Sequence, residues 1–194
     1  MEEKSIIHYR SSDRILLVGE GDFSFSLCLA RKFGTAKNMG KNIKNVLANL
    51  TELKNLGCTI LHQMDVHTMS KHQFLPCNYF DVIVFNFPHA GFIYREDDSL
   101  QIELHKKLVR GFFSSAKDIL WLSGVIHITH KTTSPYSEWK IKELASLEGL
   151  FFIGEEKFYP HRYPGYTNKR GNGRLCDITF PIGESSTFVF NKYI

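Results

Sequence analysis

Two glycines and two carboxylates stand together directly after a short aliphatic run. Residues 15–18 read Ile-Leu-Leu-Val, and residues 19–24 read Gly-Glu-Gly-Asp-Phe-Ser. Glycine lets the backbone turn sharply and removes the Cβ that would keep a ligand away, and a helix that begins near Phe23 presents free N–H groups. The pattern predicts a turn that holds a nucleotide-like cofactor. Because phosphate groups avoid carboxylates, Glu20 and Asp22 favour a cofactor with positive charge or with hydroxyl and amino donors, such as S-adenosylmethionine.

Two other interpretations of this turn stay open. In the first, Asp22 only caps the following helix and the glycines only form a tight turn. In the second, the turn binds a dinucleotide, for which the fingerprint GxGxxG requires glycine or alanine at Ser24 and an acidic residue about 20 positions further on. Residues 35–44 contain no acidic residue. The dinucleotide is therefore disfavoured.

Further polar groups follow other predicted strands. Asp65 comes after residues 59–63, which we expect to form a strand ending at the same edge as Gly19, where the carboxylate could accept a bond from an adenine amino group. The sequence NFPH, residues 86–89, follows the predicted buried strand 80–85 and joins an amide, an aromatic face, a rigid turn and an imidazole. A turn-forming aspartate and a surface histidine are the structural alternatives.

The composition limits the class of protein. The chain has 194 residues, 43% of them hydrophobic, which suits one domain with a full core. It has no apolar run of the roughly 18–20 residues that span a bilayer, no signal peptide, no CxxC pair and no helical HxxxH pair. We therefore expect a soluble intracellular protein without a membrane or metal partner. The net charge is only +4, but residues 157–174 alternate cations with aromatic rings, which indicates a nucleic-acid partner better than the net charge does.

Short apolar strands alternate with amphipathic helices along the chain. This alternation describes βαβ units and predicts an α/β fold with a mostly parallel sheet, covered on both faces. The last two strands are joined without a helix, so one antiparallel strand is expected at the end of the chain. Strands are predicted at residues 15–18, 59–63, 80–85, 124–129, 150–153 and 187–190, and helices at 23–33, 42–56, 99–122 and from 137 onward.

Five motifs in combination resemble one family. They are GEGDFSFS (residues 19–26), FNFPHAG (85–91), RGFF (110–113), ITHK (128–131) and YPGYTNKRG (163–171). Together they are similar to the Rossmann-like domain of the large-subunit rRNA (uridine-N3)-methyltransferases, which occurs in plants as many paralogues. The resemblance implies one class I methyltransferase domain over residues 1–194, with its core at about 14–190, that uses S-adenosylmethionine and acts on rRNA or other structured RNA. It also implies the nucleolus or nucleus, with the cytoplasm as the alternative.

The resemblance assigns roles to individual residues. Methylation at N3 of uracil requires that its proton leaves and that the unpaired base is aligned with the methyl donor. The methyl-transfer site is then Asn86, Phe87, Pro88 and His89, with the amide reading the base, the ring stacking on it and the imidazole taking the proton. The cofactor residues are Gly19, Glu20, Gly21, Asp22, Phe23, Ser24 and Asp65. The chemistry of the side chains, with cations for phosphates and rings for bases, adds a predicted RNA-contacting set: Lys131, Arg162, Tyr166, Lys169, Arg170 and Arg174. A solvated glycine-rich loop with ordinary surface charge is the structural alternative.

One segment departs from the family pattern. Family members carry a second strand whose terminal carboxylate is expected to bind the cofactor ribose, whereas here only the seven residues 35–41 separate Gly34 from the next predicted helix. The second strand is therefore predicted to be missing or truncated. Losing that carboxylate removes a charge-assisted hydrogen bond of roughly 1.5–3 kcal/mol. Two rivals follow: a catalytically silent RNA-binding or interaction module that retains the fold, and, less favoured, a nicotinamide-dependent oxidoreductase.

Overall fold

The computed structural model describes residues 3–34, 46–75, 77, 79–171 and 176–193. Backbone contacts group the chain into two compact units whose segments alternate along the sequence. The large unit takes its residues from 14–19, 64–158 and 182–194, and the small unit from 1–13, 20–63 and 159–181. No helix among the described residues is long and apolar enough to cross a bilayer.

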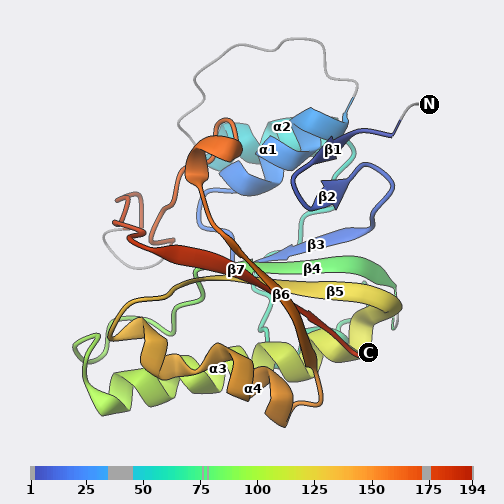
Figure 1. The fold of residues 1–194 in the computed structure, drawn as a ribbon. Helices are drawn as coiled ribbons and strands as arrows, with labels where there is room; N and C mark the ends of the chain where they lie inside the picture. Colours follow the sequence, from blue (N-terminus) through green and yellow to red (C-terminus); the bar gives the residue numbers. More distant parts are fainter. Residues whose placement is uncertain (1–2, 35–45, 76, 78, 172–175, 194) are drawn as a thin grey trace. The chain divides into compact units, whose positions relative to one another are not determined.

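The large unit is built on a five-stranded sheet in the order β3-β4-β5-β7-β6 (Figure 1). Its pairs β3–β4 and β4–β5 are parallel, and β7 is antiparallel to both β5 and β6. The prediction of a mostly parallel sheet with an antiparallel last strand is thereby confirmed. The strands are β3 (Ile15–Val18), β4 (Phe80–Asn86), β5 (Leu120–Lys131), β6 (Phe151–Lys157) and β7 (Ser185–Asn191).

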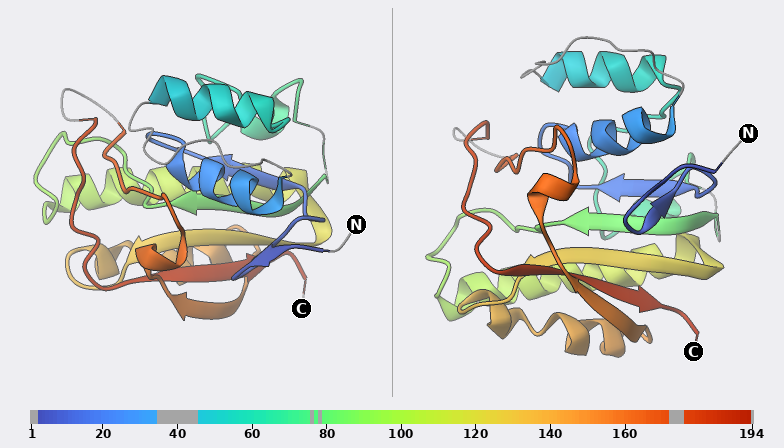
Figure 2. Two further views of the ribbon diagram at one scale, coloured as in Figure 1. Left: turned by 90° about the horizontal axis from the view of Figure 1, so that it is seen from above. Right: turned by 45° about the horizontal axis from the view of Figure 1, so that its top comes forward.

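One long helix covers a face of this sheet. Helix α3 (Ser99–Ile119) begins at Asp98, whose side chain accepts from the Leu100 N–H, and the apolar stripe of α3 packs against β4 and β7. Phe112 meets Phe85 and Phe113 meets Phe190, each with ring centroids 5.1 Å apart. Helix α4 (Ile141–Leu147) lies on the same side as α3 (Figures 1 and 2). The short helices are η1 (Met69–Lys71), η2 (Tyr136–Trp139) and, in the small unit, η3 (Pro160–Arg162).

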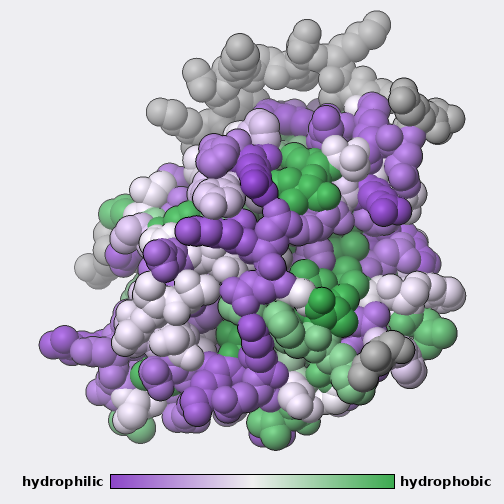
Figure 3. Space-filling view, viewed as in Figure 1, coloured by the Kyte–Doolittle hydropathy of each residue, from purple (hydrophilic) through white to green (hydrophobic). Residues whose placement is uncertain are grey.

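Strand β3 forms one edge of the sheet. No other strand among the described residues pairs with its outer side, which agrees with the predicted loss of the second strand. Residues 35–41, on which that prediction rests, lie outside the described part of the chain. At the opposite edge, β6 exposes apolar side chains, and hydrophobic surface lies beside this strand in Figure 3.

The small unit packs one helix against a hairpin and a second helix against the first. It contains β1 (Ser5–Ile6), β2 (Tyr9–Arg10), α1 (Ser24–Phe33) and α2 (Val46–Asn55). Phe25 of α1 lies at the centre, edge-on to Tyr9 and 4.8 Å from the ring of Tyr163. The Arg31 guanidinium binds both carboxylate oxygens of Glu52, at 2.7 and 2.6 Å, and so joins α1 to α2.

Two predicted elements are wrong. Residues 59–63 form no strand, because Gln63 has a left-handed φ of 58° and no described strand pairs with this segment. The helix predicted to reach residue 122 ends at Ile119, since Leu120 is extended and already begins β5. The strand at residues 124–129 is correspondingly longer in the structure than the sequence predicted.

Candidate active site

Gly19 and Asn86 come to neighbouring positions at one edge of the sheet. Strands β3 and β4 are parallel, and their register pairs Val18 with Phe85, so the two residues stand where adjacent strands end. Gly19 has a φ of 68°, and a Cβ at this position would lie 2.3 Å from Cε2 of Phe85. The backbone and the packing both require glycine here. In parallel α/β sheets, ligands bind beyond this carboxyl edge.

The side-chain amide of Asn86 is buried. Neither its Nδ2 nor its Oδ1 has a hydrogen-bond partner among the described residues. A buried polar group without a partner costs roughly 1–3 kcal/mol, and native structures rarely leave such a group without a role. An amide offers two donors and an acceptor. A ligand with complementary groups would restore the lost bonds.

The residues after Asn86 form a strained corner. Phe87 has a φ of 49°, and such a backbone costs about 1–3 kcal/mol and concentrates at functional sites. The Phe87 N–H donates to the Thr129 carbonyl over 2.8 Å, and its half-buried ring meets Phe158 edge-on. Pro88 is buried. The exposed ring beside the His89 imidazole is instead that of Phe92, with centroids 4.1 Å apart and 56% of Phe92 exposed.

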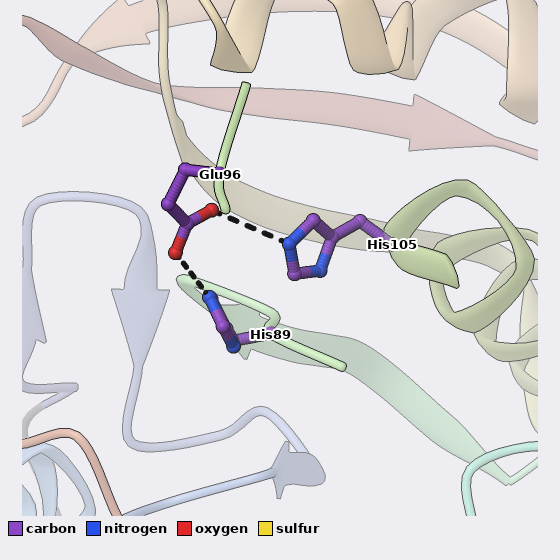
Figure 4. A group of neighbouring side chains, drawn as sticks. All are labelled: His89, Glu96 and His105. Carbon is purple, nitrogen blue, oxygen red and sulfur yellow. Dashed lines mark hydrogen bonds and ion pairs between the residues drawn. The ribbon is translucent and has the colours of Figure 1, made fainter. Parts of the chain in front are cut away.

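Two imidazoles face one carboxylate next to this corner. His89 and His105 each accept a backbone N–H at Nδ1, from Gly91 and Ala90 respectively, both over 3.1 Å. A neutral imidazole has one N–H and one lone pair, so Nε2 of His89 carries the hydrogen. His89 Nε2 donates to Glu96 Oε1 over 2.7 Å, whereas His105 Nε2 lies 3.4 Å from Glu96 Oε2 and 3.1 Å from Gln101 Nε2 (Figure 4).

The two imidazoles keep Glu96 ionised. Burial works to raise the pKa of this carboxyl, but the hydrogen bonds from His105 and His89 outweigh burial and hold the pKa well below its usual value. The result is a negative charge within a half-buried cluster, which accepts a hydrogen bond from His89 and lies beside His105.

The same three side chains must be tested as a metal site. Their ligand atoms lie within 4.8 Å of one another, and two histidines with a carboxylate suit several metals. A metal-bound histidine donates its other ring N–H to an acceptor. If a metal bound Nε2 of His89 and His105, the hydrogen of each ring would move to Nδ1. In both rings Nδ1 faces a backbone N–H donor, so two N–H groups would point at each other in each case. The donor set therefore fits a hydrogen-bonded carboxylate and does not fit a metal ion.

In the small unit, the carboxylates of the glycine turn already have protein partners. Glu20 Oε2 accepts from the N–H and the hydroxyl of Ser26, at 2.9 and 3.0 Å. Asp22 accepts from the Ser24 N–H and from the Thr167 hydroxyl, at 3.0 and 2.6 Å. Burial raises the pKa of Glu20 to about 7, although the bonds from Ser26 oppose the rise. These contacts match the structural interpretation of the turn, in which Asp22 supports the start of α1.

Residues 163–171 lie against this turn within the small unit. The Thr167 N–H donates to Ser24 Oγ over 3.0 Å, and the Ser24 hydroxyl donates back to the Thr167 carbonyl over 3.1 Å. A Cβ on Gly21 would lie 3.1 Å from Cα of Gly171. The motifs GEGDFSFS and YPGYTNKRG are therefore parts of one packed structure, which explains why both occur in one chain.

The predicted RNA-contacting residues are spread over both units. In the large unit, Lys131 Nζ lies 3.2 Å from the Tyr136 hydroxyl. In the small unit, Arg162 stacks over Tyr159 at 4.9 Å, and Lys169 Nζ donates to the Asp177 carbonyl over 2.6 Å. The Arg170 N–H donates to the Ile178 carbonyl over 3.1 Å, and the half-buried Tyr166 packs edge-on against Phe25. Arg174 lies outside the described residues.

Asp65 does not end a strand as predicted. It is exposed, and its carboxylate accepts from the His67 N–H over 3.0 Å and lies 2.8 Å from His67 Nδ1. The sequence prediction missed Glu96, Gln101 and His105 altogether. Gln101 and His105 are fully buried on the stripe of α3 that later carries Val109 and Phe112. Polar residues within an apolar helical stripe were the signal that could have found them.

Comparison with known proteins agrees with this geometry. A family described as rRNA (uridine-N3-)-methyltransferase BTM5-like matches residues 16–170. An uncharacterized protein of Arabidopsis thaliana is 50% identical, covering 99% of both chains, and the 25S rRNA (uridine(2634)-N(3))-methyltransferase of Saccharomyces cerevisiae is 24% identical, covering all of this chain and 77% of its own. These alignments span 206 and 260 positions against 194 residues here, so both relatives contain residues that this chain lacks.

The fold agrees as well. The 30S ribosomal methyltransferase of an uncultured bacterium superposes with a TM-score of 0.55 at 12% identity, covering 94% of this chain and 88% of its own. The described sheet and helices are thus those of a class I methyltransferase, and the cofactor of this class is S-adenosylmethionine. With most of its length matched, the chain belongs to the BMT5-like family of rRNA methyltransferases.

Proposed function

We propose that the protein transfers a methyl group to N3 of a uridine in large-subunit rRNA, at the carboxyl ends of β3 and β4. Membership of the BMT5-like family and the printed activity of the yeast relative support this substrate. The observation that carries the proposal is the buried amide of Asn86, which lacks a partner among the described residues where a ligand would lie.

The residues at this edge fit S-adenosylmethionine. Gly19 brings a backbone without a Cβ to the strand end beside Asn86. The turn residues Glu20, Gly21, Asp22, Phe23 and Ser24 would line the cofactor, with Asp22 acting through its charge because both of its oxygens already have protein donors. Asp65 is our candidate for the adenine amino group. When bound, the cofactor supplies a methyl group on a positively charged sulfur.

The corner after β4 would handle the uracil. Its N3 lies on the pairing edge, so the base must enter unpaired and stack on a ring. Asn86 would bind the pairing edge of the base, and His89 would take the N3 proton. The backbone of Phe87 and Pro88 would hold these two side chains on either side of the corner. We add Phe92 to Phe87 as a stacking surface, because Phe92 exposes its ring beside His89.

The RNA backbone would be bound by cations. We propose the set predicted from the sequence for this contact, with arginine and lysine on phosphates and tyrosine as an aromatic support. Work on large-subunit rRNA implies the nucleolus or nucleus as the compartment. The set is Lys131, Arg162, Tyr166, Lys169, Arg170 and Arg174.

The decisive experiment is Asn86→Ala. Methylation of a transcribed large-subunit rRNA fragment, followed by mass spectrometry of its nucleosides for N3-methyluridine, should fall about 100-fold or more, as for other preorganised amide donors. The thermal midpoint should stay the same or rise, because the variant removes a buried group that lacks a partner. Asn55→Ala, at the exposed end of α2, is the matched control. Wild-type methylation by Asn86→Ala would overturn the proposed site.

Calorimetry separates the rival functions. S-adenosylhomocysteine should bind the wild-type protein, and NAD should not. If neither binds while RNA affinity falls steeply with salt, the protein is a silent RNA-binding module and the enzymatic proposal is wrong. Binding of NAD alone would instead assign an oxidoreductase.

A further inference from the structure

We propose that Glu96 is a positioning residue that, with His105, holds His89 with its hydrogen on Nε2 and its lone pair on Nδ1, so that Nδ1 is the atom that takes the substrate proton. This inference rests on the proposed function of the corner after β4. Methyl transfer to RNA does not by itself account for a half-buried carboxylate at this position, and the inference gives Glu96 a role there.

The loop that carries Glu96 is fixed to α3 by one buried side chain. Gln101 is fully buried, and its Oε1 accepts the N–H groups of Ile93 and Tyr94 at 3.2 and 2.9 Å. Its Nε2 donates to the Gly91 carbonyl over 2.6 Å. These three bonds leave the amide one orientation, since reversing it would break all of them. The backbone between His89 and Glu96 is therefore held in one place.

His105 is fixed equally well. Its ring is fully buried and stacks on Trp139, with centroids 4.1 Å apart and planes 19° from parallel. Its Nδ1 accepts from the Ala90 N–H over 3.1 Å, and its Nε2 lies 3.1 Å from Gln101 Nε2 and 3.4 Å from Glu96 Oε2. Glu96 thus lies between a rigid imidazole and His89, and the titratable groups that face His89 among the described residues are Glu96 and His105.

This arrangement suits a base that must gain a positive charge. In the proposed step, the N3–H bond of uracil breaks, its electron pair stays on N3, and the proton passes to Nδ1 of His89. The Gly91 N–H, two residues away and 3.1 Å from Nδ1, must give up its bond as the base arrives. The imidazolium then lies 2.7 Å from an ionised carboxylate, and such pairing stabilises the charge as it forms.

The test is Glu96→Gln. The amide can present its NH2 group instead of an oxygen to His89 Nε2, so it no longer fixes the hydrogen on that atom. We expect kcat to fall about 10- to 100-fold, as for other carboxylates that orient a histidine, with the KM values for S-adenosylmethionine and RNA unchanged. The acidic limb of the kcat–pH profile should move to lower pH, because the imidazolium loses its carboxylate. Glu103→Gln, an exposed carboxylate on α3, is the matched control.

A second readout needs neither substrate nor cofactor. In the wild-type protein labelled with ¹⁵N-histidine, the His89 signals, identified by their absence in His89→Gln, should report hydrogen on Nε2, and Glu96→Gln should reduce that fraction. Unchanged kcat and pH profile in Glu96→Gln overturn this inference but leave the methyltransferase proposal standing. A wild-type protein without methylation, but with the expected tautomer, overturns the methyltransferase proposal instead. Stoichiometric zinc binding that Glu96→Gln abolishes would also overturn the inference.

Discussion

At the scale of single residues, Gly19 combines two requirements that only glycine meets. Gly19→Ala should lose about 1–2 kcal/mol for the left-handed backbone and about 1–3 kcal/mol for displacing the Phe85 ring, measured as the free energy of unfolding in urea. Gly57→Ala is the control, because its φ of 81° carries the same backbone cost while nothing lies within 4 Å of its Cβ. Equal losses in the two variants would contradict the contact with Phe85.

Glu20 makes stability depend on pH. Its pKa is raised from 4.5 to about 7 by burial, so the folded state binds the proton more tightly than the unfolded state does. The stability from protonation is complete below the unfolded pKa and is lost as the pH rises through about 7, in total about 3 kcal/mol. Glu20→Gln should remove this slope in urea unfolding between pH 5 and 8. Identical slopes in the variant and the wild type would rule out a buried carboxyl.

The candidate site was only partly predictable at this scale. Asn86 and His89 could be found because they stand next to each other in the sequence after an obvious strand. Glu96, Gln101 and His105 could not be linked to them, because they meet His89 only after α3 packs against the sheet. Likewise, the sequence predicted that the carboxylates of Glu20 and Asp22 would face a cofactor. In the structure they accept hydrogen bonds from Ser26 and Thr167.

At the scale of elements, strands with a neighbour were predicted best. Residues 15–18 and 82–85 are continuous apolar runs, and each lies in a parallel strand. Residues 59–63 contain only two aliphatic side chains, Ile60 and Leu61, and have no neighbour among the described strands. A strand depends on its neighbours for its ladder of backbone hydrogen bonds. Helical periodicity continued past Ile119, so the sequence could not locate the change from α3 to β5.

The segment 163–171 gives a prediction at this scale. Thr167→Val should remove the hydroxyl that donates to Asp22 and should loosen the segment by about 1 kcal/mol, the typical net value of one hydrogen bond. Local opening should then speed tryptic cleavage after Lys169 and Arg170 several-fold under native conditions. Thr167→Ser keeps the hydroxyl and should be cleaved at the wild-type rate. Equal cleavage of both variants would show that this bond does not hold the segment.

At the scale of the whole molecule, the last strand decides whether the sheet forms. Strand β7 lies between β5 and β6, and β6 pairs with no other described strand. A chain that stops after Pro181 loses β7, leaves β6 without hydrogen-bond partners and removes the buried contact of Phe190 with Phe113. It should yield insoluble protein or a broad, non-cooperative thermal transition by circular dichroism.

A chain that stops after Asn191 is the control for this truncation, because it keeps all of β7 and removes only the three residues behind it. It should unfold in a single cooperative transition near the wild-type midpoint, as the full chain should if it forms the single domain predicted from its sequence. Since both compact units take residues from beyond position 158, neither can be completed by an amino-terminal fragment. Cooperative unfolding of the chain that stops after Pro181 would therefore contradict the strand order and show that β6 finds another partner.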